Sequence, residues 1–486
     1  MKQSMSQALP RPPGFSACAV CVLFCITAGW AFFLGDIDGN IAALAEVSSS
    51  VKLYSDRLGL IIGAGLLMSY TVGLLAAWLI SKKPFVFIGI WVFSLAVSEA
   101  RIPGFQQVML LIRYFMMMAL IVYGGIAFAV SINRKWHPIQ KMGLALIALL
   151  IMHLFVDKYE TEALLLLPMQ LAMYVGLFFG LSQVVRTEKD LYKICLALAF
   201  VGIIMTFINL LAFKFAFQPI QGGRYRSWYS LATGFANNYV LFLIPIIWLF
   251  IQTRSSALKL LLIMIVVTGL YMLVLSGSRN ALLTLTVALF IACALWKPKY
   301  FIYFILIGVV GAGLLYVMGD VMKDLGSAGS RLGKVSNTET RFIVWKLAWS
   351  YIQESPFWGY GLSVDLQSLA SNLPVWEQFD AHNAYLGLWL RLGILGLLIN
   401  LVIYFWAIYR GARLLLELKG GAIKASLILF LLLVISIFVA GLFEENLSSR
   451  GSVQQAMWAM SVAMILVIYK LCQRKTKSIR GSSDES

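Results

Sequence analysis

The chain has 486 residues, of which 60% are hydrophobic and 13% are charged, and its mean hydropathy is +0.85. An ordinary soluble domain has about twice that share of charged residues, so composition excludes a soluble globular protein and a disordered chain. The net charge of +17 would suggest nucleic-acid binding in a soluble protein. In a membrane protein this charge is divided between the two faces of the bilayer, and we expect no nucleic-acid partner.

Apolar stretches recur along most of the chain. A spanning helix needs roughly 20 apolar residues, and several of the stretches are shorter than this. The sequence therefore predicts an all-α, polytopic membrane protein with 12–14 transmembrane helices. The fourteen stretches are 15–34, 58–80, 84–98, 108–132, 142–156, 163–185, 194–213, 239–251, 260–275, 281–296, 301–318, 384–408, 425–442 and 453–471.

The first stretch, 15–34, follows Pro10, Pro12 and Pro13, and no clear small-residue cleavage site follows it. We therefore expect a retained span and not a signal peptide. With the N-terminus in the cytoplasm, the inside loops carry a large excess of Lys and Arg, whereas the outside loops are slightly acidic. This is the positive-inside bias, and it predicts that both termini are cytoplasmic and that the number of spans is even.

The longest polar segment divides the chain into three parts. These are the N-terminal transmembrane helices in 1–318, a large outside loop in 319–383, and the C-terminal transmembrane helices with a cytoplasmic tail in 384–486. Within the loop, Ser336 and Glu339 form a capping box, which is typical of a helix start. Pro356 is expected to end this helix.

The helix predicted in the loop has apolar residues at helical spacing. Phe342, Trp345, Trp349 and Ile352 would form one aromatic and apolar face. Such a helix is expected to lie along the membrane interface, on the outer side. A simple surface anchor is the alternative, but Arg341 at its polar start could face the point where the chain re-enters the membrane.

That re-entry point begins with His382 and Asn383. The chain has three histidines, and His137 in a basic inside loop and His153 within an apolar stretch are expected to be structural. His382 differs, because it lies at the outer end of a span, directly after the largest outside loop. Its imidazole could accept or donate a proton near neutral pH. A structural role is the alternative for a single histidine.

Two further outside segments are candidates for binding an anion. The turn 276–280 contains Arg279 between small polar residues, so backbone N–H groups and a fixed cation could meet a phosphate. The segment 222–229 is rich in glycine and aromatic residues and contains Arg224 and Arg226. A lipid-facing hairpin and an interfacial anchor are the respective alternatives. Together with Arg341, these arginines favour an anionic, lipid-linked substrate.

Three segments carry a resemblance to a known family. They read SGSRNALLTL (276–285), TRFIVWKLAWSYIQESPFWGYGL (340–362) and HNAYLGLWLRLGILG (382–396). The second has the form R-x3-W-x2-A followed by a proline and a G-x-G turn, and the third begins H-N-x-x-L. In this order, over 276–396, they resemble the O-antigen ligase and polymerase superfamily of bacterial envelope glycosyltransferases.

The resemblance implies a metal-independent, inverting transfer of a glycan from an undecaprenyl-pyrophosphate carrier to a hydroxyl of a glycolipid or glycan acceptor. It implies no cofactor, and a site on the periplasmic side of the bacterial inner membrane. Arg279 and Arg341 would stabilise the leaving pyrophosphate, because guanidinium groups pair with phosphate oxygens. His382 would be the general base. Asn383, Arg224 and Arg226 are expected to contribute to substrate binding; family members also carry arginine in the loop of Arg224 and Arg226, without a one-to-one alignment of the two.

Three functions are compatible with these features. A ligase that joins a finished polysaccharide to a lipid acceptor is the leading interpretation, and a polymerase of the same superfamily is the second. A flippase or transporter for such lipids is the third. It would need charged side chains at several depths, whereas Arg113, Arg391 and Lys470 are the charged residues within the stretches. Arg391 is expected to be structural first, and the roles of Arg113 and Arg391 stay open.

Overall fold

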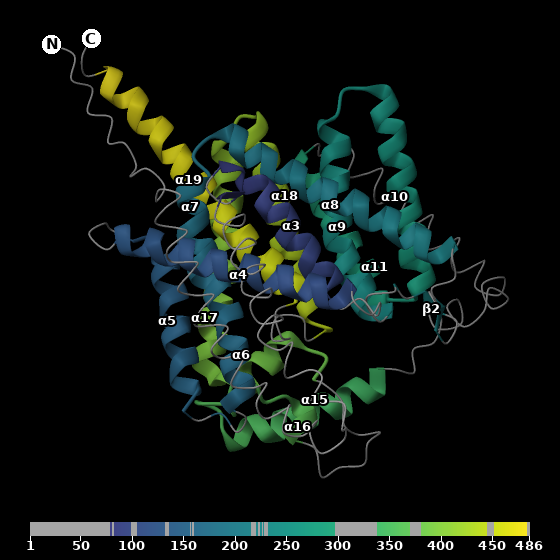
Figure 1. Cartoon of the computed structure of the whole chain (residues 1–486), viewed down its shortest axis with the longest axis vertical. Coiled ribbons are helices and arrows are strands. Elements are labelled where there is room, and N and C mark those ends of the chain that lie inside the picture. The colour runs from purple at the N-terminus through teal and green to yellow at the C-terminus, as the bar shows by residue number, and fades with distance from the viewer. Residues whose placement is uncertain are drawn as a thin grey trace, which may run out of the picture.

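The described part of the protein is a bundle of helices with one small hairpin (Figure 1). The hairpin pairs β1 (Ile220–Gln221) with β2 (Arg224–Tyr225) in antiparallel fashion. The computed structural model describes residues 78–79, 82–98, 105–131, 136–155, 157, 160–214, 220–221, 224–225, 227, 232–296, 338–369, 381–444 and 452–483. The predicted stretches 15–34 and 301–318, and nearly all of 58–80, lie outside these residues.

Eight apolar segments in the described part are long enough to cross a membrane, which confirms the predicted polytopic membrane protein. A total of 12–14 spans stays a prediction. The eight comprise α4 (Phe105–Val130), the continuous run of α6 (Glu160–Leu171), the π-helical η1 (Ala172–Leu181) and α7 (Ser182–Val184), then α8 (Glu188–Lys214), α9 (Ala232–Gln252), α10 (Ser256–Ser276), α17 (Ala384–Glu417), α18 (Ala422–Gly441) and α19 (Val453–Ser483). Shorter apolar helices are α3 (Pro84–Val97), α5 (Pro138–His153) and α11 (Arg279–Trp296).

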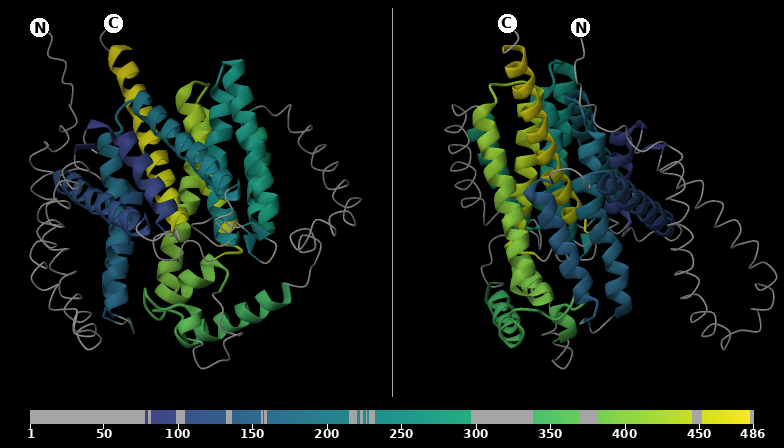
Figure 2. Two further views of the ribbon diagram at one scale, coloured as in Figure 1. Left: turned by 45° about the vertical axis from the view of Figure 1, so that its right-hand side comes forward. Right: turned by 90° about the vertical axis from the view of Figure 1, so that its left-hand side faces the viewer.

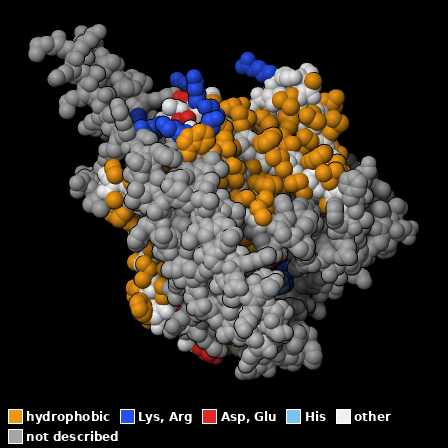
Figure 3. All heavy atoms as spheres, viewed as in Figure 1, with side chains coloured by type: hydrophobic (Ala, Val, Ile, Leu, Met, Phe, Trp, Pro, Cys, Tyr) orange, Lys and Arg blue, Asp and Glu red, His pale blue; other side chains and the backbone are white. Residues whose placement is uncertain are grey.

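The helix α18 lies at the centre of the bundle. Its sequence is apolar around the whole circumference, as is typical of a helix buried on all sides. It packs against α8, α9, α11, α17 and α19. By contrast, α10 exposes large side chains such as Leu260, Met264 and Tyr271. Hydrophobic side chains form a broad apolar flank on the face shown in Figure 3. This enclosed helix leads into the segment described below as the site.

The helix α15 (Thr338–Glu354) crosses one end of the bundle, and both views of Figure 2 place the C-terminal part of α19 at the opposite end. Val344, Ala348 and Ile352 are spaced four apart, so they form one stripe on α15 and are buried. They pack with residues of the short helix α16 (Leu366–Leu369) and with Leu390 of α17. We call this end the α15 end.

The predicted apolar face of α15 is only partly covered by protein, and its place at the membrane interface stays a prediction. Ile352 is buried, but Phe342 and Trp349 are 55% and 44% exposed, and Trp345 is half-buried. The i, i+4 stripe described above makes the protein contact instead, and it leaves these rings on the outer surface of the helix. The predicted capping residue Ser336 lies outside the described residues.

The helix α17 is broken at Gly393, which has φ of +65°. At the break, the loop after α15 replaces helical hydrogen bonds: the Tyr360 N–H donates to the Leu390 carbonyl at 2.9 Å, and the Ile394 N–H donates to the Pro356 carbonyl at 2.9 Å. A Cβ atom at position 393 would lie 1.9 Å from the carbonyl oxygen of Phe357. Glycine is therefore required here both for its conformation and for the close approach of the loop.

Two buried polar side chains hold this loop. Both ring nitrogens of His153 face carbonyl oxygens, that of Leu149 at 2.8 Å and that of Trp358 at 2.5 Å. The Nε of Arg391 donates to the Val364 carbonyl at 2.8 Å. These contacts agree with the structural roles expected of His153 and Arg391.

Arg113 is also buried. Its Nη1 donates to Ser98 Oγ at 3.0 Å, which joins α4 to the end of α3. Arg391 thus binds the loop after α15, whereas Arg113 joins neighbouring helices of the bundle.

Candidate functional site

A carboxylate joins two of the predicted catalytic residues at the α15 end. Glu444 follows the end of α18, and its Oε1 lies 3.7 Å from Nη2 of Arg341, while its Oε2 lies 3.9 Å from Nδ1 of His382. The Glu444 side chain is 14% exposed, whereas those of Arg341 and His382 are 32% and 39% exposed. The three side chains therefore form a partly open cluster, with the carboxylate between the guanidinium and the imidazole, which we call the Arg–Glu–His cluster.

His382 is held by an unusual backbone conformation at the start of α17. Its φ is +46°, in the left-handed region that non-glycine residues rarely adopt, and such strain costs on the order of 1–3 kcal/mol. Asn383 is the N-cap, and its Oδ1 accepts hydrogen bonds from the N–H groups of Tyr385 at 3.0 Å and Leu386 at 3.1 Å. The cap fixes the first turn of α17 and with it the direction of the His382 side chain.

The end of α18 also binds the segments that carry His382 and Arg279. Asn383 Nδ2 donates to the Leu442 carbonyl at 3.1 Å, and the Tyr385 hydroxyl donates to the Phe438 carbonyl at 2.8 Å. From the other side, Asn280 Nδ2 donates to the Ala440 carbonyl at 3.3 Å. Segments more than 100 residues apart in the sequence thus meet within the few residues that precede Glu444.

The turn 276–280 is a compact link between α10 and α11. Gly277 has φ of +62° and ends α10, and the Ser278 hydroxyl accepts from the Ala281 N–H at 3.4 Å, at the start of α11. Arg279 is the first residue of α11, and its side chain is exposed. The bond from Asn280 to α18 places this turn at the same end of the bundle as the Arg–Glu–His cluster.

The predicted Arg224 and Arg226 are only partly described. Arg224 lies in β2, but its side chain and the whole of Arg226 fall outside the described residues. Between them Tyr225 is buried, and its hydroxyl donates to the Asn209 carbonyl at 3.0 Å. Because β2 also contacts α10, the hairpin that carries Arg224 is fixed to the helix that ends in the turn 276–280.

The contacts of Glu444 define how the two neighbouring side chains are oriented. The Nδ1 of His382 faces Glu444 Oε2. At 3.7 and 3.9 Å the contacts of Glu444 are longer than hydrogen bonds, and such contacts commonly shorten when a substrate binds. Within the described residues, no three His, Cys, Asp or Glu side chains gather as a metal site would need.

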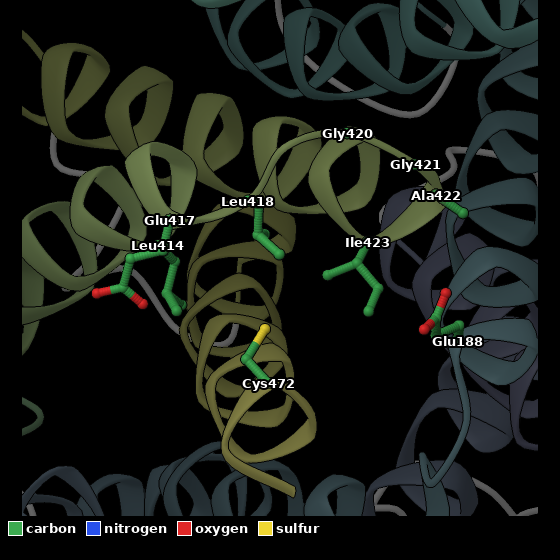
Figure 4. A pocket seen from close by; sticks show the side chains of 9 residues that line it. All are labelled: Glu188, Leu414, Glu417, Leu418, Gly420, Gly421, Ala422, Ile423 and Cys472. Atoms are coloured by element: carbon green, nitrogen blue, oxygen red, sulfur yellow. The ribbon is translucent and has the colours of Figure 1, made fainter. Parts of the chain in front are cut away.

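A pocket of about 240 Å³ lies at the other end of the bundle (Figure 4). It is lined by Glu417 at the end of α17, by Gly420 after it, by Glu188 at the start of α8, and by Cys472 of α19. Two carboxylates at its rim are unsuited to an anionic substrate. It contains none of the predicted site residues, so the chemistry indicated by the sequence lies away from this pocket.

Glu444 is the residue that sequence reasoning missed. The signal was present, because Glu444 and Glu445 directly follow the apolar stretch 425–442 on the side predicted to be outside. An acid at the end of a span, on the face that carries the candidate arginines, would have justified pairing it with His382 or Arg341. The distance in sequence between the three residues gave no indication of their contact.

Comparison with known proteins agrees with the segments that form this end of the bundle. Residues 264–401 match the model of a family described as O-antigen ligase. An O-antigen ligase of Salmonella typhimurium (strain LT2) is 31% identical over 242 residues, which are 44% of this chain and 56% of that protein. The chain thus aligns with little more than half the length of this curated relative. The matched region includes Arg279, Arg341 and His382. These findings confirm the resemblance of the chain, centred on residues 264–401, to the O-antigen ligase and polymerase superfamily.

Proposed function

We propose that this protein is a membrane glycosyltransferase of the O-antigen ligase type. In this function, it transfers a glycan from undecaprenyl pyrophosphate to a hydroxyl group of a glycolipid acceptor. The observation that carries the proposal is the Arg–Glu–His cluster, in which a base, its orienting carboxylate and a guanidinium lie within 4 Å contacts. Both comparisons, which are to ligases, favour this member of the superfamily.

The cluster suits a single displacement at the anomeric carbon. The Nε2 of His382 accepts the proton of the acceptor hydroxyl as its oxygen bonds to the anomeric carbon, and the bond from that carbon to the pyrophosphate oxygen breaks. Glu444 holds Nδ1 and stabilises the imidazolium that forms. Attack from the face opposite the leaving group inverts the configuration.

The leaving pyrophosphate takes the electrons of the broken bond. Arg341 is positioned next to the base, and Arg279 lies at the same end of the bundle. Guanidinium groups are permanently charged and donate two parallel hydrogen bonds to phosphate oxygens, so they supply the positive charge that a divalent metal would otherwise supply. The proposed reaction is therefore metal-independent.

The α15 end is proposed to face the periplasm of a bacterial inner membrane, with both termini in the cytoplasm. Lys and Arg side chains gather at the opposite end, above a broad apolar flank (Figure 3), as the positive-inside bias requires. Single cysteines at positions 330 and 370 in a cysteine-free background should react with an impermeant thiol reagent in intact spheroplasts. A cysteine at 420 should not, and its labelling would reverse the proposed orientation.

The function is tested with purified enzyme, lipid-linked donor and a lipid A-core type acceptor. His382→Ala should abolish transfer and still bind the donor, because the base acts on the acceptor. Near-normal turnover of His382→Ala would remove it from the mechanism. Failure of the native enzyme to use this acceptor would exclude the proposed ligase.

The same assay separates the ligase from a polymerase. A ligase given the donor alone should form no elongated product, since it lacks an acceptor. A ladder of products from donor alone would identify a polymerase instead. In that case Arg224→Ala combined with Arg226→Ala should shorten the ladder, because a second anionic donor would need a second basic site.

A further inference from the structure

Aromatic rings and cations form a second cluster, at the end of the bundle opposite to the α15 end. The ring of His137, which precedes α5, lies 5.1 Å from the ring of Trp406 in α17 and 5.4 Å from the ring of Tyr469 in α19. The guanidinium carbon of Arg410 lies 4.0 Å from the centre of the Tyr469 ring. Lys470 is close enough to act electrostatically on His137. We call these five residues the basic–aromatic cluster.

The positive charge of this cluster is unbalanced by the described residues. Arg410 Nε is buried and has no hydrogen-bond partner among them, and neither Arg410 nor Lys470 forms an ion pair with any of them. The nearby carboxylate of Glu417 is engaged with Arg413 at 3.3 Å. Two half-buried cations that both act on His137 are costly unless an anion compensates them.

The surroundings of His137 also carry an excess of positive charge. Its Nδ1 accepts the Ile139 N–H at 3.4 Å in the cap of α5, so the ring is held in the neutral form with Nε2 protonated. Burial, together with the positive charges of Lys470 and Arg410, lowers the pKa of His137 to about 4. The cluster therefore offers two cations and one N–H donor and no negative charge, which is the donor set that a phosphate group accepts.

The surroundings indicate that this phosphate belongs to a lipid. Along α17, Val402, Phe405 and Tyr409 form an exposed apolar stripe that ends beside Arg410, so acyl chains could lie against it. Tryptophan and tyrosine at the level of the cations are typical of the headgroup region. We propose that the basic–aromatic cluster binds the phosphate of an anionic phospholipid in the leaflet opposite to the proposed active site.

The experiment measures binding of dioctanoyl phosphatidylglycerol to the purified full-length protein by native mass spectrometry. Arg410→Gln combined with Lys470→Gln should weaken the apparent affinity about 30-fold, since each basic residue near the membrane surface contributes about fivefold. The matched control is Arg254→Gln combined with Lys259→Gln, which removes the same two charges in and near the loop between α9 and α10. The control should bind like the native protein.

Two further probes identify which part of the lipid is recognised. Dioctanoylglycerol lacks the phosphate, and glycerol 1-phosphate lacks the acyl chains, so both should bind at least tenfold more weakly than the phospholipid. Equal binding of dioctanoylglycerol, equal binding of glycerol 1-phosphate, or unchanged phospholipid affinity of the Arg410 and Lys470 variant would each overturn the proposal. If that variant is too unstable to purify, Lys470→Gln alone replaces it, because Lys470 makes no hydrogen bond or ring contact with the described residues. Its expected loss is about fivefold.

Discussion

Replacing Glu444 by glutamine tests the cluster directly, since it removes one charge and preserves the shape. The Glu444 carboxylate lies 3.9 Å from Nδ1 of His382. Coulomb's law at this distance gives about 4 kcal/mol at an effective dielectric constant of about 20 and about 1 kcal/mol in bulk water. The His382 side chain is 39% exposed, so solvent screening brings the value to about 2 kcal/mol. Loss of this stabilisation of the imidazolium corresponds to a fall of about 30-fold in kcat.

The Michaelis constant for the donor separates this role from a structural one. The carboxylate of Glu444 also lies 3.7 Å from Arg341, where it competes with the pyrophosphate for the guanidinium. Glu444→Gln should therefore leave the donor KM unchanged or lower it while kcat falls. Steady-state kinetics with purified protein measure both, and a kcat within threefold of the native value would refute the reasoning.

A matched control is Glu354→Gln in the last turn of α15. The Glu354 carboxylate accepts a hydrogen bond from the Tyr360 hydroxyl at 3.1 Å and takes no part in the Arg–Glu–His cluster. The Glu354→Gln variant should retain the native transfer activity. A loss as large as that of Glu444→Gln would show that removal of any carboxylate from the α15 end disturbs the site.

Three other changes have defined expectations. Arg341→Lys and Arg279→Lys should each lose most of the transfer activity in the same assay, because an ammonium group keeps the charge but cannot donate two parallel hydrogen bonds to the pyrophosphate; full activity of either would exclude that arginine from the leaving-group site. Transfer in detergent should survive excess EDTA, and loss with recovery on adding one divalent ion would contradict the arginine mechanism. Gly393→Ala should cost at least about 2 kcal/mol of stability, seen as a lower Tm, since the added methyl group meets the docked loop at a position with positive φ. An unchanged Tm would mean that the loop can leave the break in α17.

Hydropathy and motif spacing predicted the helical membrane fold and the order of the candidate segments. These features are local. A run of apolar residues forms a helix wherever it lies, and His382 is identified by its position at the start of such a run. The packing of α15 was predicted less well. Whether the side with Ala348 or the side with Trp349 is buried depends on the side chains of α17 against which α15 packs. The break at Gly393 depends in the same way on a loop that begins at Pro356.

The site itself was predicted only in part. His382 and Arg341 were selected for their chemical types and positions, and they do lie close to the same carboxylate. Glu444 could not be assigned, because its contacts arise from the way α18 ends between the two segments. The hydrogen bond from Asn280 to the Ala440 carbonyl, which fixes the turn 276–280, is equally non-local, because it joins helices that are distant in the sequence.

The length of α18 has a consequence for the proposed reaction. Its 20 residues rise about 30 Å at 1.5 Å per residue, which is close to the thickness of the hydrocarbon layer of a bilayer. Glu444 follows three residues after this helix, so in a membrane spanned by α18 the carboxylate would lie at the level of the lipid phosphate groups. The proposed donor, whose pyrophosphate would rest at that level, could then diffuse sideways to the site with its polyprenyl chain still in the membrane, without being extracted from the lipid phase.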